Sequence, residues 1–215
     1  RYHRIPYDET SLILVEVGGA YTAVMAVEGG QIMDGLGGTT GGPGFYSLGM
    51  IDGELAYLLG SFHKEVLFSG GAAHIAGQPD LSPEEAAHLF GADEHLNRGW
   101  EALIEGVVKG VAAEMTVVTS SREVLLSGRL CRIPSIRDEL TRRLGRFAPV
   151  RRVTGIAEVA KEAAQGAALV ADGLAGGQFT DLVQAMRLRE AQGTVLDYLH
   201  IQGAEELKRR YLSSA

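Results

Sequence analysis

Three short segments of the sequence combine glycines with a hydroxyl side chain. Residues 16–22 read Glu-Val-Gly-Gly-Ala-Tyr-Thr, residues 34–44 read Asp-Gly-Leu-Gly-Gly-Thr-Thr-Gly-Gly-Pro-Gly, and residues 125–129 read Leu-Leu-Ser-Gly-Arg. Backbone without side chains lets several N–H groups converge on one anion, and a nearby hydroxyl adds a further donor. Such segments can hold a phosphate group. A Gly-Gly pair between two strands is also a common plain turn, so each segment has a structural alternative.

The middle segment is the hardest of the three to explain as a plain turn. It places six glycines between residues 35 and 44, and ordering so much glycine costs conformational entropy. We interpret its central residues as candidate phosphate ligands, with tight packing of the loop as the alternative. These candidates are Gly37, Gly38, Thr39 and Thr40.

Acidic residues accompany these segments at Glu16, Asp34, Asp52 and Glu54. Carboxylates suit Mg²⁺, which they hold directly or through water. Asp34 is therefore a candidate catalytic group, and Asp34 and Asp52 are candidate metal ligands through water. The alternative is that Asp34 and Asp52 are turn residues or solvated surface groups.

Other common chemistries find no support in the sequence. It contains no Gly-Lys-Ser/Thr of a Walker loop, no G-x-S-x-G elbow and no H-E-x-x-H zinc motif. The single cysteine, Cys131, excludes a disulfide framework. Arg129 and Arg132 could lower the pKa of this thiol, but we favour a buried structural cysteine.

Charge is unevenly distributed along the chain. Residues 1–121 contain 5 basic and 16 acidic side chains, residues 122–215 contain 15 and 11, and the overall charge is −7. An acidic chain is a poor general binder of nucleic acid, and no apolar run approaches the ~20 residues of a membrane span. We therefore expect a cytoplasmic protein with neither partner. Nine arginines between Arg122 and Arg152 could form a patch for a small anion or lie on a solvated helix face.

Hydrophobic periodicity predicts the elements that must position these residues. The expected strands are residues 12–17, 21–27, 31–36, 123–126 and 149–153, the first of them buried on both faces. One expected helix begins at the capping sequence Ser82-Pro83-Glu84-Glu85. Three further helices are expected at residues 100–118, 135–144 and 156–174, and Ser135 and Asp138 form a capping pair for the second of these. The order β-β-β-α-β-α-β-α predicts an α/β fold in which helices cover a mixed sheet. We expect one domain at residues 12–178 and a helical extension at 179–215.

Several motifs follow one another in a specific order between residues 12 and 174. They are the Gly18-Gly19 turn, Gly30-Gln-Ile-Met-Asp34, Gly42-Pro43-Gly44, Leu-Ser-Gly128, Ala148-Pro149-Val150 and Glu162-Ala-Ala-Gln-Gly166-Ala167. This series resembles the C-terminal domain of the acetate and butyrate kinase branch of the ASKHA superfamily. It is most similar to a mostly archaeal family described as predicted butyrate kinases, to which the loop at residues 34–44 points.

The resemblance implies an RNase H-like core and an ATP/Mg²⁺-dependent phosphotransferase. Gly18, Gly19 and Thr22 would belong to a loop that binds phosphates, and Ser127, Gly128 and Arg129 to the loop that binds adenosine. The γ-phosphoryl group of ATP would pass to a small acceptor such as a short-chain carboxylate. ATP/ADP and Mg²⁺ are then the expected cofactors.

Departures from the family pattern leave other functions open. The resemblance makes Glu16 a candidate catalytic residue, because it stands where these kinases have a histidine that faces the transferred phosphoryl group. No arginine follows the Gly-Pro loop between Ser47 and Asp52, as it does in these kinases. One alternative is ATP hydrolysis that drives a conformational change. Another is a nucleotide-binding or scaffold module without catalysis.

Length is a further departure, because ASKHA enzymes close two RNase H-like domains on the nucleotide and this sequence suggests one such core. We expect the chain to be the C-terminal part of a longer protein, with residues 1–11 as the remnant of a missing N-terminal domain. The apolar stripe from Trp100 to Val118 is either core or the face of a homodimer, and core is the more common case.

Overall fold

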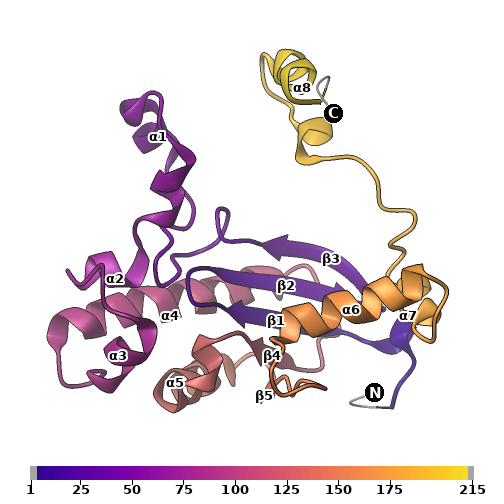
Figure 1. The fold of residues 1–215 in the computed structure, drawn as a ribbon, viewed down its shortest axis with the longest axis horizontal. Helices are drawn as coiled ribbons and strands as arrows, with labels where there is room; N and C mark the ends of the chain where they lie inside the picture. The colour runs from indigo at the N-terminus through magenta and orange to yellow at the C-terminus, as the bar shows by residue number, and fades with distance from the viewer. Residues whose placement is uncertain (1–3, 213–215) are drawn as a thin grey trace.

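Residues 4–212 are described by the structure, a computed structural model with a five-stranded mixed sheet at its centre (Figure 1). The strands are β1 (Leu12–Val17), β2 (Thr22–Glu28), β3 (Gln31–Leu36), β4 (Val124–Ser127) and β5 (Val150–Arg152). Their order across the sheet is β3-β2-β1-β4-β5. The first three strands are antiparallel neighbours, whereas β4 runs parallel to β1 and β5 runs parallel to β4. The expected mixed sheet and order of elements are confirmed.

Helices lie on both faces of this sheet (Figure 1). α4 (Glu94–Glu114) and α5 (Pro134–Leu144) pack on one face, and α6 (Glu162–Leu174) crosses the other. On the α4 face, Ile13, Val15 and Val17 are fully buried, but Leu14 and Glu16 on the opposite face are only partly covered. The prediction that the first strand is buried on both faces is therefore wrong. The reason is that α6 packs mainly against α7 (Thr180–Ala185) rather than along the strands.

The apolar stripe of the longest helix forms the core of the molecule. Trp100, Leu103, Val107 and Val111 of α4 are at most 1% exposed, which decides between the two readings of the stripe in favour of core. The helix begins before the expected residue 100 because the carboxylate of Asp93 accepts a hydrogen bond from the Leu96 N–H at 2.8 Å.

The remaining helix starts differ in how well the sequence predicts them. The start of α3 (Pro83–His88) is confirmed, with a reciprocal capping box between Ser82 and Glu85. The expected capping pair of Ser135 and Asp138 is wrong, since α5 begins at Pro134 without a side-chain cap. α6 begins six residues later than expected, because the backbone N–H groups of Ile156 and Ala157 donate to the Gln165 side chain instead of forming a helix.

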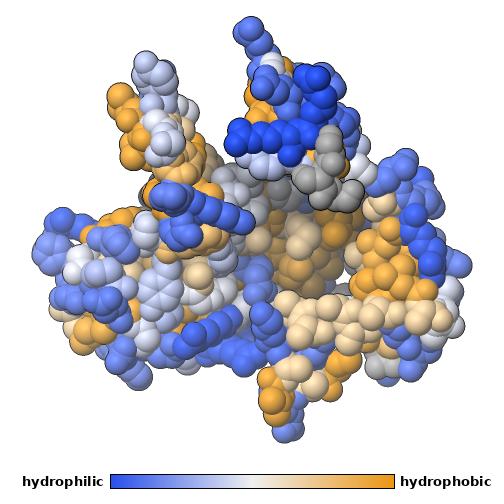
Figure 2. All heavy atoms as spheres, turned by 45° about the horizontal axis from the view of Figure 1, so that its top comes forward, coloured by the Kyte–Doolittle hydropathy of each residue, from blue (hydrophilic) through white to orange (hydrophobic). Residues whose placement is uncertain are grey.

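Two parts of the chain stand away from this body, and the surface is hollowed between them (Figures 1 and 2). The first contains α1 (Gly53–Leu59) and the 3-10 helix η2 (Lys64–Phe68), and the second contains η4 (Val195–Tyr198) and α8 (Ala204–Leu212). The other short elements are η1 (Tyr7–Glu9), α2 (Gly71–Ile75) and η3 (Leu130–Arg132). No helix within residues 4–212 is long and apolar enough to cross a membrane. Residues 1–3 and 213–215, at the ends of the segments expected at 1–11 and 179–215, lie outside the described residues.

One ionisable side chain is buried in the core beside the sheet. Glu114, the last residue of α4, is 2% exposed, and its Oε2 has no hydrogen-bond partner within the described part of the chain. Burial raises the pKa of Glu114, and the nearby charge of Asp34 raises it further. Folding therefore favours the protonated carboxyl.

Replacing this group by Glu114→Gln is expected to raise the free energy of unfolding by about 1–3 kcal/mol at pH 8, because the amide leaves no charge to bury. The folded pKa lies above the ordinary value of 4.5, so the wild type is fully stable below that pH and loses stability as the pH rises through the folded pKa. Urea unfolding from pH 4 to pH 8 measures the difference. An equal difference in the free energy of unfolding between variant and wild type at pH 4 and at pH 8 would contradict the prediction.

Candidate functional site

The carboxyl ends of the parallel strands meet at one edge of the sheet, where ligands bind in open α/β folds. β1 ends before Gly18 and Gly19, and β4 ends before Gly128 and Arg129. These two glycine segments touch: a Cβ atom built on Gly19 would lie 3.5 Å from both Cδ and Nη1 of Arg129. The structure therefore brings together the first and third segments singled out in the sequence.

Hydrogen-bond donors without a partner among residues 4–212 belong to the residues at this junction. The Gly18 N–H closes the β1–β2 hairpin by donating to the Tyr21 carbonyl at 2.8 Å. Within residues 4–212, the N–H groups of Gly19 and Ala20 have no acceptor, and neither has the Ser127 hydroxyl. Two backbone N–H groups, one hydroxyl and one guanidinium thus lie at the same edge of the sheet, and donors of these kinds suit an anion.

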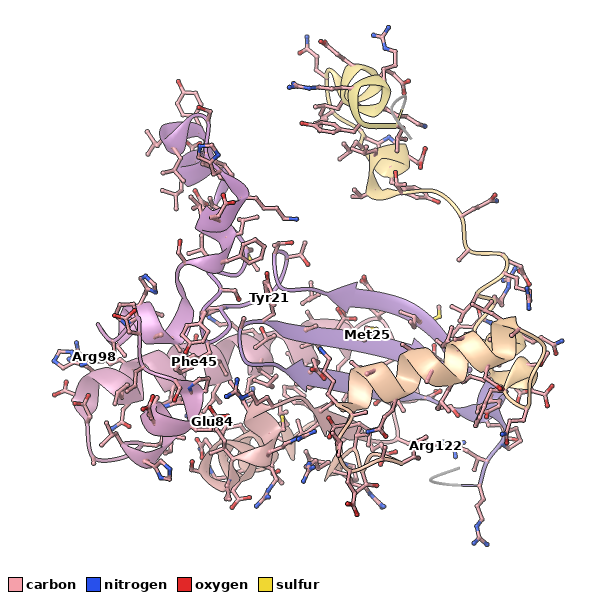
Figure 3. All side chains as sticks on the ribbon, in the orientation of Figure 1. Tyr21, Met25, Phe45, Glu84, Arg98 and Arg122 are labelled. Atoms are coloured by element: carbon pink, nitrogen blue, oxygen red, sulfur yellow. The ribbon has the colours of Figure 1, made fainter. Side chains whose placement is uncertain are left out.

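The guanidinium of Arg129 is itself held in an ion pair. Its Nε donates to Oε1 of Glu84 at 2.6 Å, and its Nη2 donates to Oε2 at 2.8 Å. Glu84 lies in the first turn of α3 and is labelled in Figure 3. Sequence reasoning missed this residue, because 45 positions separate it from Arg129 and its local pattern marks only a helix start.

The candidate catalytic carboxylates lie on opposite faces of the sheet. Glu16 pairs with Ser127 in register and shares its face. Asp34 pairs with Ala26, whose fully buried side chain faces α4. A bulge between Ala26 and Val27 causes this, because a one-residue shift in register turns the following side chains to the other face. The structure does not bring Glu16 and Asp34 to one reaction centre.

The acidic groups proposed for a metal have local hydrogen-bonding roles. Oδ1 of Asp52 caps α1 by accepting from the N–H groups of Glu54 and Leu55 at 2.9 and 3.1 Å. Oδ1 of Asp34 accepts from the Gly35 N–H at 2.7 Å. Among the residues that the structure describes, no group of three or more acidic, histidine or cysteine side chains could hold a metal ion.

The glycine-rich segment at residues 34–44 packs tightly against its neighbours. A Cβ on Gly42 would lie 2.6 Å from Cα of Gly106 in α4, and one on Gly38 would lie 2.4 Å from Cδ1 of Tyr21. Gly37 has free space around it, with the Thr40 hydroxyl oxygen nearest at 3.9 Å. Close approach of backbone thus accounts for much of the glycine content, which was the structural alternative for this loop.

The hydroxyl groups of the first two segments are mostly engaged within the protein. The Thr22 hydroxyl, buried on the α4 side, donates to the Gly42 carbonyl at 3.4 Å. The Thr40 hydroxyl accepts from the Gly37 N–H at 2.9 Å, whereas Thr39 is exposed. The side chain of Thr22 therefore lies on the opposite face of the sheet from Glu16 and Ser127.

A groove of about 710 Å³ lies on the other side of this loop, between it and α4. Its wall is largely apolar and includes Leu36, Pro43, Met50 and Gly106. None of the residues singled out in the sequence as ligand-binding lines it.

The arginines between Arg122 and Arg152 do not gather into one patch. Arg142 and Arg143 pair with Glu139 on α5, and Arg143 also reaches Glu101 of α4. Hydrogen bonds from Arg142 and then Arg143 lower the pKa of Glu139 to about 2. Arg132 and Arg152 instead share Glu162 at the start of α6, at 2.9 and 3.8 Å. The helix-face interpretation holds for the arginines of α5, Arg129, Arg132 and Arg152 lie toward the carboxyl edge, and Arg151 pairs with Glu123 at the opposite end of the strands.

Two buried groups complete this edge. Cys131 is fully buried, and this burial raises the pKa of its thiol to about 12, with the charge of Glu16 adding to the effect. The interpretation as a buried structural cysteine is confirmed. Gln165, whose role the motif at residues 162–167 did not indicate, holds the loop after β5 by hydrogen bonds to Ile156, Ala157 and Ala160.

Comparison with solved structures identifies this fold. The acetate kinase from Entamoeba histolytica superposes with a TM-score of 0.57 at 12% identity, covering 68% of this chain and 41% of that one. The acetate kinase from Porphyromonas gingivalis superposes with a TM-score of 0.56 at 16% identity, covering 75% of this chain and 46% of that one. A propionate kinase from Francisella tularensis superposes with a TM-score of 0.55 at 20% identity, covering 65% of this chain and 39% of that one. The chain thus spans less than half the length of each kinase. The expected ASKHA fold is confirmed, while kinship with butyrate kinases in particular stays a prediction.

Sequence comparison places the chain more narrowly. No curated protein matches it. A family model described as "Protein of unknown function (DUF1464)" matches residues 1–201. The chain therefore belongs to this family, within the ASKHA fold.

Proposed function

We propose that the carboxyl edge binds an adenine nucleotide with Mg²⁺, and that the protein passes the γ-phosphoryl group of ATP to a small acceptor. The observation that carries the proposal is that the unpaired N–H groups of Gly19 and Ala20 lie at the same sheet edge as Ser127 and Arg129, with Arg129 against Gly19. The solved structures that share the fold are named acetate and propionate kinases. A short-chain carboxylate is therefore the acceptor class that we propose.

Phosphoryl transfer depends mostly on positioning and electrostatic stabilisation, which this edge can supply. The hairpin N–H groups of Gly19 and Ala20 orient the phosphate oxygens, and the Arg129 guanidinium offsets their charge. Ser127 lies beside Glu16 in register, so its hydroxyl is placed next to the one candidate carboxylate on this face. Mg²⁺, held by phosphates and water with Glu16 as the available carboxylate, supplies charge neutralisation when bound. Asp34, on the opposite face, takes no part in this arrangement.

The identity of Glu16 favours a second candidate, ATP hydrolysis. An ionised carboxylate cannot donate a hydrogen bond to the charge that develops on a transferred phosphoryl group, as an imidazole can. It can accept a proton from water, which is the nucleophile in hydrolysis. Phosphate release without an added acceptor would distinguish hydrolysis from transfer to acetate, propionate or butyrate.

The first test is calorimetric titration of Mg·ADP and Mg·ATP into the protein in its full natural length, beside Gly19→Asp. We expect this variant to bind at least about tenfold more weakly, because its carboxylate would repel the phosphates, and tenfold corresponds to about 1.4 kcal/mol. The fold should tolerate the change, since a Cβ at Gly19 meets only ordinary contacts with Arg129.

Gly53→Asp is the matched control, because a Cβ at Gly53 meets nothing within 4 Å. The residue begins α1, in one of the two parts of the chain that stand away from the sheet (Figure 1). This variant should bind like the wild type. Absence of binding to the folded wild type would overturn the nucleotide proposal, and equal binding by Gly19→Asp would overturn the site.

A further inference from the structure

The ion pair between Arg129 and Glu84 lies beside the proposed phosphate site. The pair is bidentate, and both side chains are about half exposed. Glu84 is not free to drift, because α3 is fixed by its capping box and by the buried Pro83 and Ala86 that flank it. The carboxylate is therefore held out from the start of a well-anchored helix toward the junction of β1 and β4.

The two edges of the Arg129 guanidinium have different neighbours. Nε and Nη2 are taken by Glu84, while Nη1 lies near Gly19, at 3.5 Å from the position of a Cβ there. A phosphate binds arginine through the same paired donors as a carboxylate does. A phosphate that binds the Nε and Nη2 edge of Arg129 must displace Glu84, whereas one that binds the Nη1 and Nη2 edge would leave the ion pair in place.

We propose that Glu84 is a latch that competes with the nucleotide phosphate for Arg129. This inference rests on the proposed function, and it assigns Glu84 the role of a positioning residue that sets nucleotide affinity. Without phosphate, Glu84 holds the guanidinium beside the hairpin. With phosphate bound, Arg129 exchanges one anionic partner for another, so the affinity reflects the difference between the two contacts.

Titration of Mg·ADP into Glu84→Gln tests the latch in the full-length protein. We expect the Kd to fall about two- to fivefold, because an exposed ion pair contributes up to ~1 kcal/mol and the variant removes this competitor. Arg129→Gln should raise the Kd. The double variant Glu84→Gln/Arg129→Gln should bind no tighter than Arg129→Gln alone, a dependence that a merely structural role of Glu84 would not produce.

Glu85→Gln is the charge-matched control. Glu85 is the next residue of α3, but it bonds Ser82, and glutamine preserves that capping box. A Kd that stays at the wild-type value in this variant separates the latch from a general loss of negative charge. An equal gain in both variants, or weaker binding by Glu84→Gln, would overturn the latch and leave the nucleotide site standing. A folded wild type that binds no Mg·ADP would overturn both proposals.

Discussion

Gly128→Ala is expected to lower the free energy of unfolding by about 3 kcal/mol or more. Gly128 has a φ of +96°, a backbone conformation that residues with a side chain rarely adopt, at a cost of about 1–2 kcal/mol. A Cβ there would also lie 2.4 Å from the Val17 carbonyl oxygen and 2.9 Å from the Val17 nitrogen. Val17 ends the central strand β1 and is fully buried, so neither backbone can move aside cheaply.

Urea unfolding of the wild type and variant measures this loss. Gly19→Ala serves as the control at the same edge, because its Cβ would make only ordinary contacts at 3.5 Å. We expect the control to stay within about 0.5 kcal/mol of the wild type, as surface substitutions usually do. Equal losses at Gly19 and Gly128 would contradict the prediction. A nucleotide-binding defect in any Gly128 variant would consequently report the loss of the β1–β4 contact rather than the loss of a ligand.

The fold was largely predictable because its signals are local. The apolar run at residues 12–17 and the turns at Gly18 and Gly29 specify strands and hairpins through neighbouring residues alone. The helix at Trp100 is likewise fixed by its own periodicity. The six residues from Glu94 to Gly99 escaped prediction because Leu96 is the one large apolar side chain among them and only the Asp93 cap marks the start.

The site was less predictable because its geometry depends on contacts distant in sequence. With the two-residue turn at Gly29 and Gly30, strict alternation would pair Asp34 with Met25, on the same face as Glu16. The bulge beside Ala26 instead turns Asp34 toward α4. Nothing in the local sequence marks a bulge of this kind, so the sequence groups two carboxylates that the sheet separates.

The role of each glycine was equally hidden from the sequence. Gly19, Gly42 and Gly128 all read as members of glycine clusters. Tertiary contacts distinguish them, because a Cβ at Gly19 would meet only the Arg129 side chain at 3.5 Å, whereas one at Gly42 or Gly128 would clash with neighbouring backbone. Composition therefore located the loops, and tertiary contacts decide which of them can bind an anion.

Gly42→Val provides the sharpest test of whether the loop at residues 34–44 packs or binds phosphate. Its Cβ would lie 2.6 Å from Cα of Gly106 and 3.1 Å from the Gly106 carbonyl carbon, so the loop and α4 would have to separate. We expect a loss of about 3 kcal/mol in the free energy of unfolding, the upper part of the range for overpacked sites. The Kd for Mg·ADP of the folded fraction should stay within about twofold of the wild type, a change of less than about 0.5 kcal/mol.

Gly37→Ala makes the comparison decisive, because the nearest atom to its Cβ is the Thr40 hydroxyl oxygen at 3.9 Å. If packing is the purpose of the loop, this variant keeps both its stability and its nucleotide affinity. If the loop instead cradles phosphate, Gly37→Ala and Thr39→Ala would weaken Mg·ADP binding without lowering the urea midpoint. That outcome would assign the loop at residues 34–44 to the nucleotide-binding site. Stability and affinity move separately in the two cases, so measuring both on the same variants assigns the loop its role.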